Sequence, residues 1–257
     1  MFVNILTDYQ THIRPDPLRG GIFADGMGLG KTLTLLSLIA FDKGSQMGVS
    51  MKWRTDRKSV SLENQGRNEG EYSLETGVRT EGTLVVCPPS VMSAWITQLD
   101  DHTVPGALKT YLYYGERRTE DIEELKEYDL VLTTYTTLSY ESKDRPARKM
   151  EWRRIILDEA HAIKNITAKQ SRVVRKLKGK YRWAVTGTPI LTGCIDLFSF
   201  MVFLRFSPFS ERRHWSELVQ RPLNQGLENG LTLLQVTQCM FSCFSSQYDW
   251  VFPCKWP

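Results

Sequence analysis

Residues 24–32 read Ala-Asp-Gly-Met-Gly-Leu-Gly-Lys-Thr. A short apolar run, residues 21–24, leads into this stretch, and a longer one, residues 33–40, follows it. The pattern predicts a strand, a glycine-rich turn and a helix, which is the context in which a helix N-terminus binds phosphate. The chain is therefore expected to bind a nucleoside triphosphate.

The residue types in this turn suit that chemistry. The glycines let the backbone bend so that successive N–H groups point at phosphate oxygens, Lys31 supplies a charge to the β- and γ-phosphates, and Thr32 supplies a magnesium ligand. The strict phosphate-loop pattern has glycine where this chain has Asp25, so the match is to the helicase-type variant of the loop. The predicted nucleotide-binding residues are Asp25, Gly26, Met27, Gly28, Leu29, Gly30, Lys31 and Thr32.

A second motif, Asp158-Glu159-Ala160-His161, directly follows the strand-like run Arg154-Ile155-Ile156-Leu157. In a phosphate-loop ATPase, a first carboxylate in this place holds magnesium and a second one orients the attacking water. These are the roles expected for Asp158 and Glu159, and the alternative is an acidic pair that is merely solvated. For His161 the alternatives are a coupling role and a structural histidine.

A third motif, Thr186-Gly187-Thr188-Pro189, ends a further apolar run. Its two hydroxyls and its glycine can hydrogen-bond toward the segment that contains Asp158. We expect Thr186, Gly187 and Thr188 to couple the nucleotide site to the rest of the protein. A plain turn is the alternative, because glycine and proline mark turns in general.

Apolar runs alternate along the chain with segments of helical spacing. Strands are expected at residues 83–87, 108–114, 129–135, 154–157 and 181–186, and helices at residues 90–99, 118–128 and 168–178. We expect Ser90 to cap its helix and Val91, Trp95 and Leu99 to face inward. This order predicts an α/β fold with a mostly parallel sheet covered by helices on both faces, and ligands in such sheets bind beyond the carboxyl ends of the strands.

Composition sets further limits. The chain has 257 residues, 41% of them hydrophobic, and a net charge of +4, which by itself is too weak to argue for a nucleic-acid ligand. No apolar run approaches the ~20 residues that span a bilayer, so no membrane partner is expected. Cys239 and Cys243 have no histidine nearby, so a zinc site is not expected. A basic cluster either attracts DNA or forms a solvated helix face; its members are Arg172, Arg175, Lys176, Lys178, Lys180 and Arg182.

Taken jointly, the motifs resemble the first lobe of the superfamily-two, Swi/Snf-type DNA-dependent ATPases, in the helicase-like transcription factor branch. The matching segments are residues 25–32, 84–90 with Trp95, 133–135, 158–161 and 186–189. The Thr-Gly-Thr-Pro form of the last motif favours this group over RNA helicases, which usually carry Ser-Ala-Thr there. The resemblance divides the chain into an amino-terminal extension, 1–20, an ATP-binding lobe, 21–235, with a flexible insertion at 42–82, and a carboxyl tail, 236–257.

The resemblance implies a P-loop NTPase of recombinase-like fold that uses ATP and magnesium and acts on double-stranded DNA or chromatin in the nucleus. It makes Lys31, Asp158, Glu159 and His161 the catalytic residues, with Thr32 and Asp158 on magnesium. It also implies contacts to the DNA backbone, which carry no sequence information; the residues concerned are Ser90, Thr133, Thr134 and Tyr135. A β-rich strand end is the alternative for the last three.

The chain departs from the family pattern at several places. Gly26 stands where relatives carry an acidic residue, Leu191-Thr192 replaces Gln-Asn, and the segment around Gln10 does not match the adenine-reading motif. After Val236 the pattern stops and no second lobe follows, so we expect nucleotide binding with little turnover. The alternatives are a catalytically silent fragment that binds nucleotide, DNA or a partner protein, and a fragment of an RNA helicase.

Overall fold

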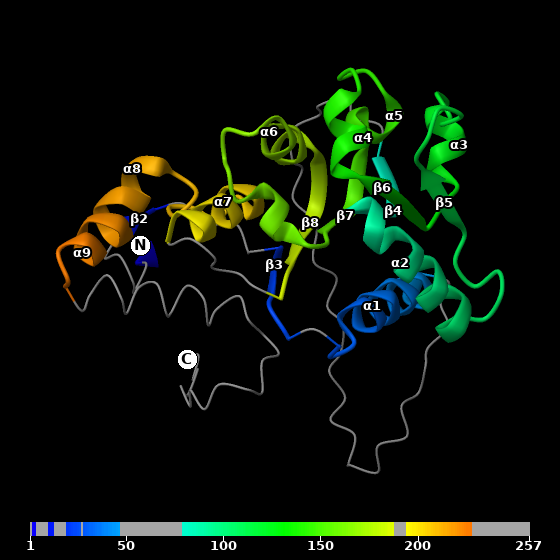
Figure 1. The fold of residues 1–257 in the computed structure, drawn as a ribbon, viewed down its shortest axis with the longest axis horizontal. Coiled ribbons are helices and arrows are strands. Elements are labelled where there is room, and N and C mark those ends of the chain that lie inside the picture. The colour runs from blue at the N-terminus through cyan, green and yellow to red at the C-terminus, as the bar shows by residue number, and fades with distance from the viewer. Residues whose placement is uncertain are drawn as a thin grey trace, which may run out of the picture.

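A six-stranded sheet forms the centre of the protein in the computed structural model, which describes residues 2–3, 10–12, 19–26, 28–46, 79–187 and 194–227 (Figure 1). The strands lie in the order β3-β8-β7-β4-β6-β5, and neighbouring strands run parallel, as predicted. Their bounds are β3 Gly20–Phe23, β4 Arg79–Cys87, β5 Thr110–Tyr113, β6 Leu130–Thr134, β7 Glu151–Leu157 and β8 Lys178–Val185. Two further short strands, β1 Phe2–Val3 and β2 Gln10–Thr11, pair with each other antiparallel.

Helices cover both faces of this sheet. Figure 1 shows α1 and α2 together on one side of the strands and α4 and α6 on the other. The helices are α1 Lys31–Gln46, α2 Pro89–His102, α3 Ile122–Lys126, α4 Tyr135–Tyr140, α5 Pro146–Lys149, α6 Lys169–Lys176, α7 Cys194–Leu204, α8 Arg212–Trp215 and α9 Arg221–Asn224, with a 3-10 turn at Ala160–Ile163 and a π turn at Ser216–Gln220. Among the described residues, no helix has both the length and the apolar character needed to cross a bilayer.

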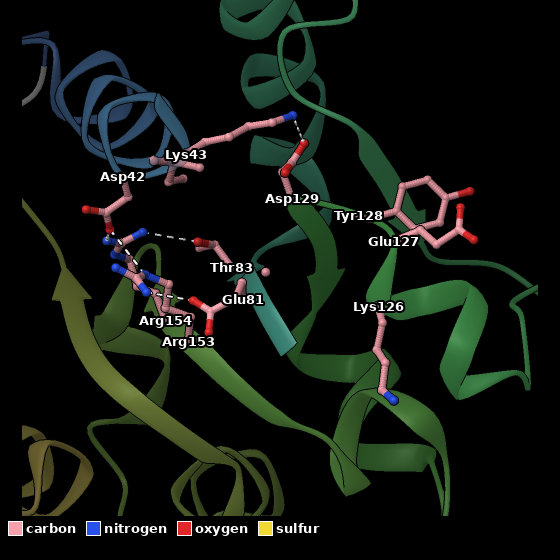
Figure 2. Close-up of a pocket in the computed structure, with 12 residues that line it drawn as sticks. Asp42, Lys43, Glu81, Thr83, Lys126, Glu127, Tyr128, Asp129, Arg153 and Arg154 are labelled. Carbon is pink, nitrogen blue, oxygen red and sulfur yellow. Dashed lines mark hydrogen bonds and ion pairs between the residues drawn. The ribbon is translucent and has the colours of Figure 1, made fainter. Parts of the chain in front are cut away.

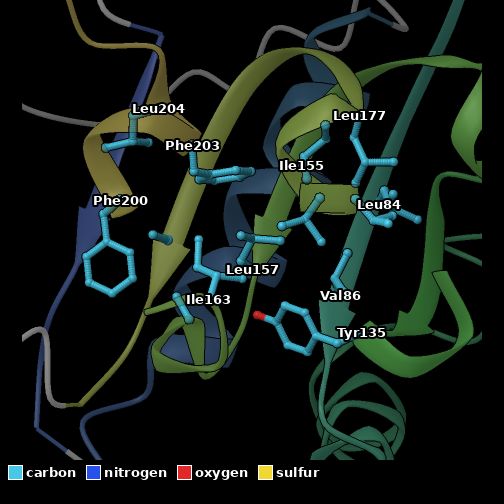
Figure 3. Packing of buried hydrophobic residues seen from close by; sticks show 14 of the residues in the cluster. Leu84, Val86, Tyr135, Ile155, Leu157, Ile163, Leu177, Phe200, Phe203 and Leu204 are labelled. Atoms are coloured by element: carbon cyan, nitrogen blue, oxygen red, sulfur yellow. The ribbon is translucent and has the colours of Figure 1, made fainter. Parts of the chain in front are cut away.

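The pleat of the strands divides the core into two layers, because successive side chains point to opposite faces. Leu84 and Val86 of β4 pack on one face, whereas Val85 and Cys87 pack on the other with α1 and α2. Figure 3 shows the first layer, in which strand residues meet aromatic side chains of α7 such as Phe200 and Phe203. Strands that are buried on both faces read as continuous apolar runs, and this is why the sequence located them.

Helix α2 begins one residue earlier than predicted, and its cap differs. Pro88 is its N-cap and Pro89 its first residue, so the prediction that Ser90 caps the helix is wrong. Proline suits the first helical position because the amide it lacks would have no intrahelical partner there. The buried residues are Met92, Trp95 and Leu99, at the 3- and 4-residue spacing of one helix face, and Val91 is partly buried against the same layer. The inward positions predicted for Val91, Trp95 and Leu99 are therefore confirmed, and Met92 joins them.

Other element boundaries also differ from the predictions. Helix α1 extends to Gln46 and β4 begins at Arg79, so the first and last residues of the predicted insertion 42–82 belong to regular structure. The helix predicted over 118–128 is confined to α3. Helix α4 was not predicted, although the Thr134 side chain caps it by accepting a hydrogen bond from the Thr137 N–H at 3.0 Å.

All six strands end at the same edge of the sheet because they run parallel. The glycine-rich turn follows β3, Asp158 follows β7, and Thr186 follows β8. The β6 strand ends at the Thr133-Thr134 pair, and β4 ends at Cys87. The carboxyl edge therefore brings together the motifs that the sequence singled out.

Candidate nucleotide-binding site

The glycine-rich turn has a backbone that requires glycine. Gly28 and Gly30 adopt φ angles of 80° and 74°, in the left-handed region that other L-residues rarely enter. Among the described residues, and apart from the chain neighbours of each glycine, no atom lies within 4 Å of the position that a Cβ would take at Gly28 or Gly30. Helix α1 begins immediately afterwards at Lys31, and its first N–H groups have no intrahelical acceptor. Met27 lies outside the described residues.

Lys31 folds back along the turn. Its half-buried ammonium donates to the carbonyl oxygens of Asp25 at 2.9 Å and Gly26 at 2.7 Å. Thr32 is also half-buried in the first turn of α1, and Asp25 is buried. The turn therefore brings a positive charge and a hydroxyl next to the amino end of a helix, and these are the donor types that bind a magnesium–triphosphate.

Asp158 forms hydrogen bonds through its backbone N–H, its backbone carbonyl and both carboxylate oxygens. Its N–H donates to the Val86 carbonyl at 2.9 Å, and its Oδ1 accepts from the Glu159 N–H at 2.9 Å. Its Oδ2 accepts from the indole Nε1–H of Trp95 at 2.7 Å, and its carbonyl oxygen accepts from the Tyr135 hydroxyl at 2.8 Å. A carboxylate oxygen has two lone pairs, so each carboxylate oxygen can still accept from a metal-bound water.

Glu159 has a strained backbone. Its φ and ψ angles of 49° and 51° are left-handed, which is uncommon for a residue with a Cβ and is often found at functional sites. One carboxylate oxygen, Oε2, lies 3.1 Å from Nδ1 of His161, although the alignment falls short of a hydrogen bond. Both side chains are partly exposed, so they remain accessible at the carboxyl edge.

The groups packed next to Asp158 are neutral. Burial, and then the negative charge of Asp158, raises the pKa of the Cys87 thiol to about 12. The same two causes raise the pKa of the Tyr135 hydroxyl well above its ordinary value. Neither group ionises near neutral pH, so neither adds a second charge beside Asp158.

In the sheet, strand β8 lies between β3, which leads into the glycine-rich turn, and β7, which leads into Asp158. The Thr186 N–H donates to the Phe23 carbonyl at 3.1 Å, directly before the turn, and the neighbouring β7 strand leads into Asp158. The predicted coupling residues Thr186 and Gly187 therefore lie between the two halves of the site. Thr188 lies outside the described residues.

The residues expected to face DNA divide into two groups. Ser90 is exposed in the first turn of α2, which is compatible with the expectation. Thr133 and Thr134 are fully buried; the Thr133 hydroxyl donates to the Tyr113 carbonyl at 2.9 Å, and Tyr135 contacts Asp158. Hydroxyl contacts from these three residues to a DNA backbone do not fit the structure, because the hydroxyls are already bonded inside the protein.

The basic cluster near α6 also divides. The Arg182 guanidinium is buried against the Phe203 ring, donates to the Phe203 carbonyl at 3.2 Å, and has a pKa that burial lowers to about 9. Arg175 donates to the carbonyls of Ser171 and Ile166. Arg182 therefore belongs to the interior, and the half-buried Arg175 is bonded to backbone carbonyls of the protein itself, so both guanidinium groups are engaged within the fold. The exposed members are Arg172, Lys176, Lys178 and Lys180.

The match to a protein-family model agrees with this architecture. The model of the SNF2-related domain matches residues 7–249, which is most of the chain and extends into the segment 236–257. The chain belongs to the SNF2-related family. One similar relative is the SWI/SNF-related matrix-associated actin-dependent regulator of chromatin subfamily A member 3-like 1 of Arabidopsis thaliana, which is 54% identical over 260 residues. The helicase-like transcription factor of Mus musculus is 42% identical over 171 residues.

The SNF2-related fold is also seen in solved structures. The SWI2/SNF2 ATPase core of Sulfolobus solfataricus in complex with double-stranded DNA superimposes with a TM-score of 0.64 and 29% identity, over 87% of this chain and 39% of that chain. The Arabidopsis relative is matched over 94% of this chain and 30% of its own length, and the mouse protein over 65% and 17%. The SNF2-related chain thus spans less than half the length of each of these proteins.

The site of this SNF2-related chain fits magnesium together with a nucleotide. In the described part of the chain, no group of three or more histidine, cysteine or acidic side chains is arranged to hold a metal alone. Magnesium differs from zinc in this respect, because it commonly uses one or two protein oxygens and takes its other ligands from phosphate and water. The Thr32 hydroxyl and the Asp158 carboxylate are protein oxygens of this kind.

Sequence reasoning did not assign Trp95 to the site. It placed this residue on the apolar face of a helix, and the burial is confirmed. The available signal was chemical. A buried indole N–H requires an acceptor, and the other buried residues of this helix face, Met92 and Leu99, have no side-chain oxygen to supply one. Tyr135 was assigned to DNA, and the structure instead places it against Asp158.

Proposed function

We propose that this chain is the ATP-binding lobe of a DNA-dependent ATPase that acts on double-stranded DNA or chromatin in the nucleus. The observation that supports it is the carboxyl edge of the sheet. There a glycine turn with positive φ angles leads into Lys31, and Asp158 with Glu159 follows the strand two positions away. Parallel strands are about 4.8 Å apart, so about 10 Å separates the ends of β3 and β7, a span that a magnesium–triphosphate fills.

Each residue has a specific role in this proposal. The Lys31 ammonium, which already lies on the carbonyls of the turn, binds the β- and γ-phosphates. Thr32 and Asp158 would hold magnesium, which would supply positive charge against the phosphates when bound. Glu159, strained and accessible beside His161, orients the attacking water.

The DNA part of the proposal has separate support. The Sulfolobus structure that this chain resembles contains double-stranded DNA, and the Arabidopsis relative is named as a regulator of chromatin. In this chain, Ser90 is exposed at the amino end of α2, and exposed lysines flank α6. Such groups contact phosphates without reading sequence.

Lys31→Ala tests the proposal, and Lys43→Ala is its matched control. Both lysines belong to α1, but Lys43 lies at the other end and pairs with Asp129. We expect Lys31→Ala to abolish binding of a magnesium-bound, non-hydrolysable ATP analogue in calorimetry, because the phosphates lose their charged partner. Lys43→Ala should bind as the unaltered chain does. Equal affinities for the unaltered chain and Lys31→Ala would refute the assignment.

A second measurement addresses turnover. Release of inorganic phosphate from ATP by the full chain should be slow, as expected for little turnover, but should increase when duplex DNA is added and increase less with single-stranded RNA. Nucleotide binding without any DNA-stimulated hydrolysis would instead identify the chain as a nucleotide-binding module.

A further inference from the structure

Two side chains from different elements bind the same residue, Asp158. The indole N–H of Trp95, on α2, donates to Oδ2 at 2.7 Å, and the hydroxyl of Tyr135, at the start of α4, donates to the carbonyl oxygen at 2.8 Å. Trp95 is fully buried and Tyr135 is 4% exposed. Both bonds are therefore shielded from water.

The Trp95 bond is of a strong type. A hydrogen bond to an ionised acceptor is roughly twice as strong as a neutral one, and the low local dielectric strengthens it further. The indole has a single donor and no acceptor, so it has no other bond to exchange for this one. Phenylalanine would fill most of the same space in the apolar layer without the N–H.

The two bonds fix different parts of Asp158. The Trp95 N–H fixes Oδ2 while the Glu159 N–H fixes Oδ1, so the carboxylate cannot rotate without breaking a bond. The Tyr135 hydroxyl fixes the peptide that leads into the strained Glu159. A displacement of α2 or of α4 therefore acts directly on the position of this carboxylate.

We propose that Trp95 and Tyr135 are positioning residues for Asp158, and that they connect α2 and α4 physically to the magnesium site. This inference rests on the proposed function, because it assigns magnesium to Asp158. Groups that orient a metal ligand in this way typically change metal affinity by about 10- to 100-fold when they are removed.

The connection has a spectroscopic consequence. If Asp158 holds magnesium, its carboxylate would be a weaker acceptor for the Trp95 indole N–H when the metal is bound, and the indole proton resonance would shift. Trp152 provides an internal reference, because its buried indole donates at 2.9 Å to the Ala147 carbonyl, a backbone group with no part in the site.

The experiment uses the full chain labelled with ¹⁵N at tryptophan. The indole resonances are recorded with a saturating non-hydrolysable ATP analogue while magnesium chloride is added. Trp95→Phe and Trp152→Phe identify their resonances. We expect the Trp95 resonance to shift with magnesium and the Trp152 resonance to stay in place.

The variants supply a second measurement. Trp95→Phe should raise the magnesium concentration needed for tight nucleotide binding by about tenfold and leave magnesium-free affinity unchanged. Tyr135→Phe should also raise the magnesium concentration needed, but by less, because the Tyr135 hydroxyl contacts the backbone carbonyl of Asp158 and not its carboxylate. Trp152→Phe should leave the magnesium requirement unchanged. If Trp95→Phe does not fold, its resonance is identified by elimination from single variants of the other tryptophans, and the wild-type titration decides.

The outcomes separate this inference from the proposed function. A magnesium-dependent shift of Trp95, together with a raised magnesium requirement in Trp95→Phe, supports it. Tight magnesium–nucleotide binding with an unmoved Trp95 resonance overturns the inference and leaves the proposed function standing. An absence of nucleotide binding to the wild-type chain overturns both.

Discussion

The two edges of the sheet both carry charged side chains, but they hold these charges differently. At the amino edge, a cavity of about 70 Å³ is lined by charged residues from α1, β4 and β7 (Figure 2). There Arg154 pairs with Asp42 and donates to the Thr83 hydroxyl, and Arg153 pairs with Glu81 at 2.6 Å. Each cation in these contacts has a carboxylate opposite it.

At the carboxyl edge, neutral groups hold the buried carboxylate. The Asp158 carboxylate accepts from an indole and from a backbone amide, and in the described part of the chain it forms no ion pair with a lysine or an arginine. Its charge is therefore stabilised but not cancelled, and it remains available to a cation from outside. Charges that pair with one another at the amino edge stabilise the fold, whereas the carboxylate held by neutral donors at the carboxyl edge can still bind a cationic ligand.

Arg154→Ala should have the largest effect on stability. The Arg154 side chain is 5% exposed, and its loss leaves Asp42 partly buried without this partner. We expect a loss of about 3 kcal/mol in the free energy of unfolding, at the low end for a broken buried pair because Asp42 keeps some contact with water. Denaturant titration measures it, and magnesium–nucleotide affinity should not change. The matched control is Arg213→Ala, whose exposed pair with Glu217 contributes less than about 0.5 kcal/mol.

Asp158→Asn tests the other edge. The amide oxygen can still accept from Trp95, so the fold should persist, but the charge for magnesium is lost. We expect magnesium to lose its effect on nucleotide affinity, a change of at least about tenfold. Asp129→Asn is the comparison at the amino edge, where the carboxylate pairs with Lys43 at 2.6 Å. If both variants kept the same magnesium dependence, the contrast between the edges would fail.

Cys87 gives a pH dependence at the carboxyl edge. Burial beside Asp158 raises the pKa of this thiol from 9.0 to about 12, so above pH 9 the unfolded chain releases a proton that the native chain keeps. Its contribution to stability is complete below pH 9 and is lost as the pH rises toward 12, by up to about 1.4 kcal/mol per pH unit. The unfolding free energies of the wild type and Cys87→Ala should therefore converge by about this amount between pH 8 and pH 10. Parallel pH profiles would contradict the prediction.

Glu159 gives the smallest expected effect. Glycine adopts the left-handed conformation at position 159 without strain, whereas alanine keeps the penalty of the Cβ. Glu159→Gly should be more stable than Glu159→Ala by about 1 kcal/mol in thermal or denaturant unfolding. Both variants lack the carboxylate, so both should lose hydrolysis equally. A more stable alanine variant would show that the strain is absent.

The sequence was sufficient for the parts of the fold that depend on local patterns. Residues 84–87 are apolar throughout because both faces of β4 are covered, and the glycine spacing before Lys31 predicts a turn and a helix. The carboxyl edge followed from these patterns, because parallel strands bring their ends together.

The partners of individual side chains could not be predicted in the same way. Arg153 and Arg154 are adjacent in one strand, but Arg154 is buried against Asp42, which is 112 residues away. Trp95 and Asp158 are 63 residues apart, and Thr133 and Thr134 are buried only because β5 and α4 cover them. Such contacts depend on how elements stack, and hydrophobic periodicity does not contain that information.

The amino edge also determines where the chain tolerates added length. Arg153 reaches Glu81 near the start of β4 and Asp42 near the end of α1, so the two points that flank residues 47–78 are held together by one side chain. A loop closed between fixed neighbouring points costs only about 0.6 kcal/mol more for each doubling of its length. A fluorescent domain inserted between α1 and β4 would therefore join ends that already meet, on the side of the sheet away from the glycine turn, and would yield a labelled protein suited to following nucleotide binding in real time.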